Sequence, residues 1–452
     1  MAFTRSKIAE KQKMKKFIYT STFVLIGIFI IWFSFFKNTE VKTKNNRTPV
    51  TITYWHYWTG FEGDALKYVV EKFNNEHKDI KVNLVTISEP WKKSLLSITG
   101  GRPPDLLNIS SEWLPDLATR GALTSLDDYC KKYNIKENLF IPVYWKMLNY
   151  KNHIWGLPIT PESCVIFWNK DHFKEVGLDP EKPPKNITDW KLYSDKLTIK
   201  NKNGEIIRAG FLPSWPSWAN SVYPLLFNGS WGNSDGDILT ANHPNNIKAW
   251  EWVQEFSRSL GAENIQSFEE EFGNYQGPNN PFYSGKISFQ INGVWEANFI
   301  SKFAPKLNYG AAVAYDNAGN PITSVISTDI VIPKGAKHSD EAFYFISWLM
   351  KQRNIEDLVI RQKKFSPLLS SCNEDFIKNH PNKYIKIFID AARSEKASYF
   401  PPTTIFQIYK REMKRAFQEV SSLTKDPKTA LDEVQIKLDE ELKRQKKYED
   451  LR

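Results

Sequence analysis

The sequence predicts an α/β protein whose main sheet is parallel, and three observations indicate this class. From residue 50 onward, short β-rich runs alternate with stripes of apolar residues at helical spacing. The chain has 452 residues, which is enough for two or three domains. Hydrophobic residues make up 41% and charged residues 25%, so the chain is neither disordered nor fibrous.

The first three strands are expected at 50–55, 80–87 and 106–109. Between the first two, Leu66, Val69, Val70 and Phe73 recur at the i, i+3, i+4, i+7 spacing of a helix. Further helices are expected at 91–98 and at 113–120, where Gly121 ends the pattern. This βαβαβ order implies a parallel sheet with helices on both faces.

Later segments continue the alternation. Residues 164–168 and 286–291 are expected to be buried strands, and the chain from Ser366 onward is expected to be helical and charged.

The N-terminus carries a predicted membrane anchor. Six basic residues precede an apolar run from Phe17 to Phe36, and a helix of this length spans about 30 Å, the thickness of the hydrocarbon core. The run ends in Trp32-Phe33-Ser34-Phe35-Phe36 and has no small-residue cleavage site. We therefore expect a cytoplasmic segment at 1–16, a transmembrane signal anchor at 17–36 and a spacer at 37–49, with the bulk of the chain extracytoplasmic. An unusually long cleaved signal peptide is the alternative.

Charge and cysteine content exclude several classes of protein. Residues 1–47 hold ten Lys/Arg against two acids, which leaves only +2 of the total charge of +10 for the rest of the chain. A nucleic-acid groove needs clustered basic charge, so no nucleic-acid partner is expected. The three cysteines cannot build a disulfide scaffold or a four-thiolate zinc site, and no metal or cofactor is expected.

Catalytic signatures are nearly missing. Gly232-Asn233-Ser234-Asp235-Gly236 matches the nucleophile-elbow pattern, but its flanks favour a turn between two short strands. No catalytic residue is therefore assigned, although a carboxylate pair assembled in space could not be recognised from sequence. The 16 tryptophans are more than cores of this size need, which indicates an aromatic binding surface.

A set of ordered motifs carries a family resemblance. They include Thr53-Tyr54-Trp55-His56-Tyr57-Trp58-Thr59-Gly60, Gly101-Arg102-Pro103-Pro104-Asp105-Leu106, Gly156-Leu157-Pro158, Asn292-Gly293-Val294-Trp295 and Val331-Ile332-Pro333-Lys334-Gly335. In this order, over residues 50–440, they resemble the family 1 extracellular solute-binding proteins of ABC importers, the sugar-binding members above all. Two departures are the predicted anchor and Trp168, which stands where the family usually has tyrosine.

The resemblance implies a two-lobed periplasmic-binding-protein-like fold of type II, with the ligand in the interlobe cleft. The N-terminal lobe is expected to comprise 50–159 with 294–327, and the C-terminal lobe 160–293 with 328–452. Chain crossings are expected near Ile159–Glu162, Asn292–Trp295 and Ile326–Ile330.

The cleft is expected to combine flat aromatic rings with polar groups that orient hydroxyls. The stacking candidates are Trp58, Trp113, Trp215, Trp218, Trp231 and Trp295. The polar candidates are Glu62, Ser111, Glu112, Glu162, Glu296 and Asp329, and Gly293 is expected to serve a hinge. Each tryptophan could instead be core packing, and Glu62 could simply favour a helix N-terminus.

The predicted function is that of an extracytoplasmic receptor that captures a carbohydrate and delivers it to ABC permease subunits with a cytoplasmic ATPase. A monomer and no enzymatic activity are expected. Few arginines lie in the candidate cleft segments, which favours a neutral sugar, although Arg102, Arg361 and Lys363 could approach from other loops. The alternatives are a membrane-tethered sugar sensor for a signalling partner and a polysaccharide-acting enzyme.

Overall fold

The computed structural model describes residues 48–273, 275 and 277–449. The predicted cytoplasmic segment 1–16, the anchor 17–36 and the spacer up to residue 47 lie outside the described residues. Within the described part of the chain, no helix combines the length and the apolar character needed to cross a membrane. The described residues from Val50 onward form one compact unit.

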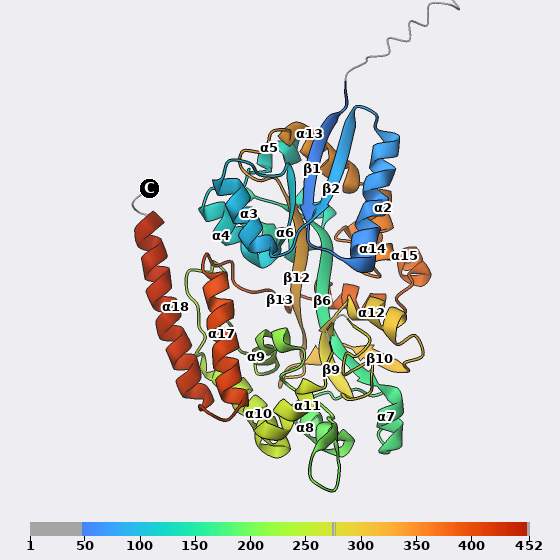
Figure 1. Cartoon of the computed structure of the whole chain (residues 1–452), viewed down its shortest axis with the longest axis vertical. Helices are drawn as coiled ribbons and strands as arrows, with labels where there is room; N and C mark the ends of the chain where they lie inside the picture. The colour runs from blue at the N-terminus through green and yellow to red at the C-terminus, as the bar shows by residue number, and fades with distance from the viewer. Residues whose placement is uncertain (1–47, 274, 276, 450–452) are drawn as a thin grey trace, which may run out of the picture. The chain divides into compact units, whose positions relative to one another are not determined.

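Three parallel strands open the N-terminal lobe, as predicted (Figure 1). Strand β1 (Val50–His56) pairs in parallel with β2 (Ile80–Thr86) and with β3 (Leu106–Ser110). Helices α2 (Gly60–Glu76) and α3 (Pro90–Thr99) make the two connections between them.

Two helical layers cover this sheet because successive side chains of a strand point to opposite faces. Leu106 packs into the cluster that includes α2, α13 (Ser339–Leu349) and α14 (Gln352–Arg361). Its neighbour Leu107 packs into a different cluster, with α4 (Leu114–Thr119) and side chains from α3. The predicted covering of both faces is confirmed.

Two long strands run from one lobe into the other. The first part of β6 (Leu157–Asn169) pairs antiparallel with β12 (Pro321–Val331), which in turn pairs antiparallel with β3. The main sheet is therefore mixed, and the prediction of a parallel main sheet holds only for β1, β2 and β3. From Cys164 onward, β6 pairs with β9 (Phe289–Gly293), and its end also pairs with β10 (Tyr309–Ala312). Figure 1 shows β6 and β12 passing through the middle of the molecule.

The predicted lobe boundaries after residue 293 are wrong. The segment 294–327, expected in the N-terminal lobe, contains α12 (Glu296–Phe303) and β10, and β10 pairs with the C-terminal half of β6. The segment after residue 328, expected in the C-terminal lobe, contains α13 and α14, which pack on the N-terminal sheet. Asn292–Trp295 is therefore no crossing, since the strands on both sides of it belong to the same lobe.

The third passage between the lobes instead follows α14. The chain leaves the N-terminal lobe after Arg361 and reaches α16 (Ile385–Arg393), which packs on β6 and β12 in the cluster around Phe167 and Phe388. This crossing brings Lys364 into the middle of the molecule.

The remaining helices and strands complete the two lobes. They are α5 (Asp127–Lys132), α6 (Pro142–Leu148), β4 (Asn149–Tyr150), β5 (His153–Ile154), α7 (Lys170–Glu175), α8 (Ile187–Leu197), β7 (Ile199–Lys200), β8 (Ile206–Arg208), α9 (Tyr223–Leu226), α10 (Pro244–Leu260), α11 (Ala262–Glu270), β11 (Ala314–Tyr315), α15 (Glu374–Asn379), β13 (Ala397–Ser398), α17 (Phe406–Ser421) and α18 (Pro427–Glu449), with short 3-10 turns η1 (Ser111–Trp113), η2 (Glu137–Leu139), η3 (Ser217–Ser221) and η4 (Leu369–Ser371).

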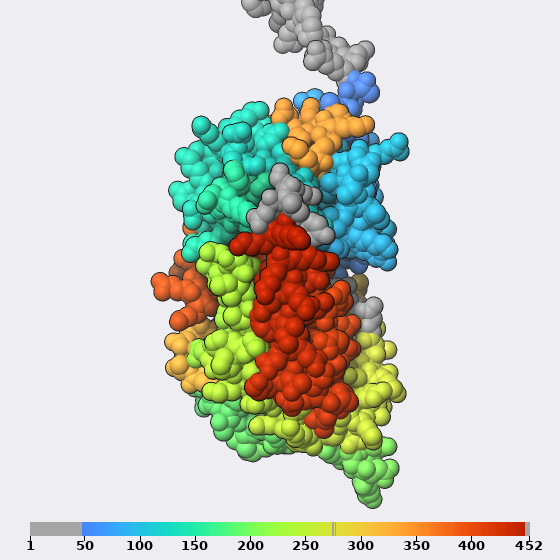
Figure 2. Space-filling view, turned by 90° about the vertical axis from the view of Figure 1, so that its left-hand side faces the viewer, coloured from blue at the N-terminus to red at the C-terminus, as the bar shows by residue number. Residues whose placement is uncertain are grey.

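The C-terminal lobe buries a large aromatic core. Trp190 and Trp250 are fully buried there, among the side chains of α8, α10, α17 and α18. Helices α17 and α18 pack against each other and form the orange-red outer face in Figure 2. Much of the tryptophan content therefore serves packing.

Candidate functional site

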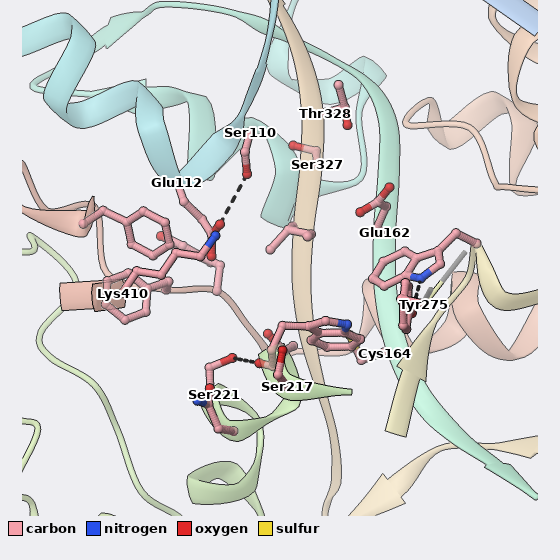
Figure 3. Close-up of a pocket in the computed structure, with 18 of the residues that line it drawn as sticks. Ser110, Glu112, Glu162, Cys164, Ser217, Ser221, Tyr275, Ser327, Thr328 and Lys410 are labelled. Carbon is pink, nitrogen blue, oxygen red and sulfur yellow. Dashed lines mark hydrogen bonds between the residues drawn. The ribbon is translucent and has the colours of Figure 1, made fainter. Parts of the chain in front are cut away.

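A cavity of about 730 Å³ lies where β6 and β12 pass between the lobes. Residues from both lobes line it, including Tyr57 and Ser110 from the N-terminal lobe and Trp218 and Lys410 from the C-terminal lobe. Figure 3 shows Glu112, Glu162, Tyr275 and Lys410 arranged around this space from four different segments of the chain. Its volume falls within the range of about 300–1,000 Å³ that is usual for small-ligand sites.

The N-terminal wall follows from the topology of the parallel sheet. Strands β1 and β3 end at the same edge, so the residues after them meet there. Trp58 and Thr59 follow β1, Glu112 follows β3, and the Tyr57 hydroxyl lies 3.1 Å from Thr328 Oγ1 of β12. The two predicted strand ends therefore do contribute to one cavity.

An aromatic wall faces them from the C-terminal lobe. The rings of Trp218 and Trp295 meet edge to face with 5.4 Å between their centroids. Trp295 Nε1 donates a hydrogen bond of 2.8 Å to Tyr275 Oη, and Tyr275 donates one of 2.6 Å to Asn292 Oδ1. These hydrogen bonds fix the orientation of the Trp295 indole.

Gly293 makes room for that indole. A Cβ atom at this position would lie 2.0 Å from a ring carbon of Trp295, so the ring lies directly over the glycine. We expected Gly293 to act as a hinge, but its missing side chain serves this close contact instead. Gly293 itself is buried at the end of β9 and is not among the residues that line the cavity.

A buried ion triad forms the floor. Lys364 Nζ lies 2.8 Å from Glu62 Oε1 and 2.6 Å from Glu162 Oε1, and the three side chains are 2%, 12% and 11% exposed. Burial raises the pKa of Glu162, although Lys364 opposes the shift. Burial would lower the pKa of Lys364, but the two carboxylates outweigh it and raise this pKa. Lys364 thus lies within ion-pair distance of two carboxylates.

Glu112 is a second polar group that lines the cavity. Its carboxylate accepts a hydrogen bond of 3.3 Å from Ser110 Oγ. Burial raises the pKa of Glu112, and the positive charge of Lys410 on α17 opposes this shift. Lys410 itself is exposed at the rim of the cavity.

The structure brings seven of the thirteen predicted site residues to the cavity. They are Trp58, Glu62, Glu112, Glu162, Trp218, Trp231 and Trp295. Glu62 lies in the first turn of α2, where an acid favours the helix dipole, and its role as a ligand contact stays a prediction.

Three other predicted residues lie close by but point elsewhere. Ser111 Oγ accepts a hydrogen bond from the backbone N–H of Ser327. The Trp113 ring packs between Tyr57 and Trp91. Trp215 packs on Phe272 and Tyr275, behind the cavity wall. These side chains support the site and do not line it.

Two predicted acids are buried in the core. Glu296 is fully buried, accepts hydrogen bonds from Tyr283 Oη and Gln290 Nε2, and has its pKa raised to about 8 by burial. Asp329 is fully buried in β12, where it accepts a hydrogen bond from Ser327 Oγ and burial raises its pKa. Neither lines the cavity.

The sequence patterns do not indicate four further residues that line the cavity: Lys364, Tyr275 and the α17 residues Tyr409 and Lys410. We considered Lys363, whose Nζ instead donates to Ser301 Oγ, while its neighbour Lys364 enters the site. No local motif marks these residues, and only the helical spacing of Tyr409 and Met413 could have indicated that α17 turns one face inward.

The described residues offer no metal site, since no three His, Cys, Asp or Glu side chains among them could hold a metal ion. What the cavity does offer is flat indole and phenol rings beside carboxylates, hydroxyls and an amide, which suits a polyhydroxylated ligand with apolar C–H faces.

Comparison with known proteins identifies the family. The sequence profile of the bacterial extracellular solute-binding proteins matches residues 61–354. The chain belongs to this family. The sn-glycerol-3-phosphate-binding periplasmic protein of Pectobacterium atrosepticum is 24% identical to this solute-binding protein over 327 residues, which are 67% of this chain and 70% of the relative.

Solved structures share the fold. CpMnBP1 with mannotriose bound is 30% identical, with a TM-score of 0.77 over 86% of this chain and 99% of the other. The same protein with mannobiose bound is 29% identical, with a TM-score of 0.78. An ABC transporter solute-binding protein from Thermotoga lettingae, bound with α-D-tagatose, is 18% identical with a TM-score of 0.72 over 87% and 100% of the two chains, a likeness of fold alone. The two-lobed periplasmic-binding-protein-like fold is thus confirmed.

Proposed function

We propose that this solute-binding protein captures a neutral oligosaccharide in the interlobe cavity and delivers it to the permease of an ABC importer. The observation that carries the proposal is the cavity itself, where the rings of Trp58, Trp218 and Trp295 face a set of carboxylates and hydroxyls. Indole rings match the C–H faces of sugars, and the polar groups match their hydroxyls. The likeness to CpMnBP1, which was solved with mannotriose, supports a sugar of this class.

The charges in the cavity favour a neutral ligand. Lys364 is held by two carboxylates, so it offers no unpaired positive charge to an anion. Lys410 and Lys414 lie at the exposed rim, and no arginine is among the described residues that line the cavity. A phosphate usually recruits arginine forks or a free buried lysine.

Glycerol phosphate is the second candidate, because the curated relative from Pectobacterium atrosepticum is described as binding it. The paired state of Lys364 argues against this ligand here.

We also propose that the protein acts as a monomer and releases its ligand unchanged, as a binding protein and not as an enzyme.

Thermal-shift measurements on the full chain test the ligand class. Mannobiose and mannotriose should raise the melting temperature in a concentration-dependent way, since a ligand that binds only the folded state stabilises it. sn-Glycerol-3-phosphate at the same concentrations should leave the melting temperature unchanged. A shift with glycerol phosphate and none with any sugar would reverse the assignment, and mass spectrometry of the recovered sugar would reveal any cleavage.

We further propose that residues 17–36 stay attached and anchor the receptor in the membrane. The protein should then remain with the membrane fraction after a high-salt wash, which releases proteins held by charge alone. Tryptic peptides from the residues before Phe17 should be found in that fraction. A mature protein in the soluble fraction that begins near residue 38 would show a cleaved signal peptide instead.

A further inference from the structure

A second hollow opens beside the cavity. It measures about 380 Å³, and we refer to it as the outer hollow. It is lined by Ser230–Ser234 on one side and by Glu395–Ser398, Tyr399, Pro401 and Pro402 on the other. Leu225, Trp231, Ser398 and Tyr399 line both spaces, so the outer hollow adjoins the cavity directly.

The wall of the outer hollow is held in place by close packing. The segment 232–236 is a turn, as predicted, although a single bridge between Gly232 and Leu239 closes it in place of the two short strands that we expect from the sequence. A Cβ atom at Gly236, whose φ is +70°, would lie 2.4 Å from the carbonyl carbon of Pro402. The missing side chain of Gly236 thus allows the turn to press against the Pro401–Pro402 segment, and a larger residue at this position would clash with the Pro402 backbone.

Trp231 forms the partition between the two spaces. Its Nε1 donates a hydrogen bond of 2.8 Å to the Ser221 carbonyl, and its ring meets Tyr409 edge to face at 5.8 Å. The ring is therefore fixed from the cavity side.

The outer hollow repeats the chemistry of the cavity. Trp231 and Tyr399 supply aromatic surface, and Ser230, Glu395 and Lys396 supply polar groups. Glu395 and Lys396 are exposed, and within the described residues neither side chain has a hydrogen bond or ion pair of its own. These charged ends are available to a ligand's hydroxyl groups.

We infer that the outer hollow receives the far end of a linear oligosaccharide whose inner residues occupy the cavity. The inference rests on the proposed function and extends it from the class of ligand to its length. A chain passing Trp231 and Tyr399 would contact Glu395 and Lys396 only when it is longer than the cavity can hold. Affinity should therefore rise with chain length beyond the trisaccharide.

Calorimetric titration of the full chain, in a detergent without a sugar headgroup, tests this. Mannobiose, mannotriose and mannohexaose form one series, and maltose, maltotriose and maltohexaose form another. In the series that binds, the hexasaccharide should bind about five- to tenfold more tightly than the trisaccharide, which corresponds to one or two further hydrogen bonds.

A paired substitution locates the effect. The double variant Glu395→Ala/Lys396→Ala should lose the gain in affinity for the hexasaccharide and keep the wild-type affinity for the trisaccharide. The double variant Lys136→Ala/Glu137→Ala is the matched control, because it removes the same two adjacent charges from an exposed site that lines neither space. It should leave both affinities unchanged.

Three outcomes overturn the inference. Equal affinities for the trisaccharide and the hexasaccharide would show that the outer hollow stays empty, while the proposed function stands. A gain with length that survives in Glu395→Ala/Lys396→Ala would show that the chain leaves the cavity by another route. No binding of either series at any length would contradict the proposed function itself, and the inference with it.

Discussion

Replacing Lys364 by methionine should lower the free energy of unfolding by about 3–5 kcal/mol at neutral pH. Methionine fills the space of the lysine stem but leaves Glu62 and Glu162 together, buried and without a counter-charge. Such a loss is larger than the effect of most single substitutions. Chemical denaturation of the wild type and of Lys364→Met measures it.

The loss of stability in Lys364→Met should grow as the pH rises. Burial already raises the pKa of Glu162, and removing Lys364 removes the charge that opposes this shift. The folded variant then holds a proton on Glu162 in a pH range where the unfolded chain does not, so its free energy of unfolding falls as pH rises. The deficit relative to wild type should accordingly be smaller at pH 5 than at pH 8.

Lys72→Met provides the control. Lys72 Nζ lies 2.6 Å from Asp357 Oδ2 and joins α2 to α14, but this pair is 17% and 34% exposed. Breaking it should cost no more than about 1 kcal/mol, with little dependence on pH between 5 and 8. If Lys364→Met lowers the free energy of unfolding no more than Lys72→Met does, Lys364 does not neutralise two buried carboxylates. Our description of the floor of the cavity would then be wrong.

Trp295→Ala should weaken binding of mannotriose by about 1–3 kcal/mol, or roughly five- to 150-fold in the dissociation constant. The half-buried indole lines the cavity beside Trp218, so removing it removes the apolar surface on which a sugar face would lie. The fold should survive, because the ring belongs to a cavity wall and not to a buried cluster. Calorimetric titration measures the affinity.

Two further variants distinguish the effect of displacing the Trp295 ring from the effect of removing a tryptophan ring. Gly293→Ala keeps every aromatic side chain but places a Cβ atom where the Trp295 ring lies, so it should displace the ring and weaken binding in the same direction. Trp155→Ala removes a half-buried tryptophan that packs against the N-terminal sheet away from the cavity, and it should leave the affinity unchanged. Wild-type affinity in Trp295→Ala would exclude this ring from the binding surface.

The parts of the fold that could be predicted are those specified by local pattern. The strands at β1, β2 and β3 follow from β-rich runs, and α2 follows from the spacing of Leu66, Val69 and Phe73. The lobes to which 294–327 and 328–361 belong could not be predicted in this way. They depend on which edge of β6 accepts β10 and on which face of the sheet receives α14, and both partners are distant in sequence.

The site residues also divide into those that a local sequence pattern marks and those that depend on distant parts of the chain. Trp58 and Glu112 were predictable, because they follow parallel strands whose ends share one edge. Lys364 pairs with Glu62, although the two residues are about three hundred positions apart in the sequence. No motif marks the crossing that brings Lys364 there. Glu296 shows the opposite error, since it is adjacent to Trp295 in sequence yet turns into the core at the start of α12.

A crystal structure of the protein grown with mannotriose tests the central claim most directly. We expect density for the sugar in the cavity, with a ring against Trp295 or Trp218 and hydroxyls within hydrogen-bond distance of Glu112 or Glu162. A sugar bound outside the cavity, or a cavity that stays without sugar at saturating mannotriose, would contradict the assignment of this site to a neutral oligosaccharide.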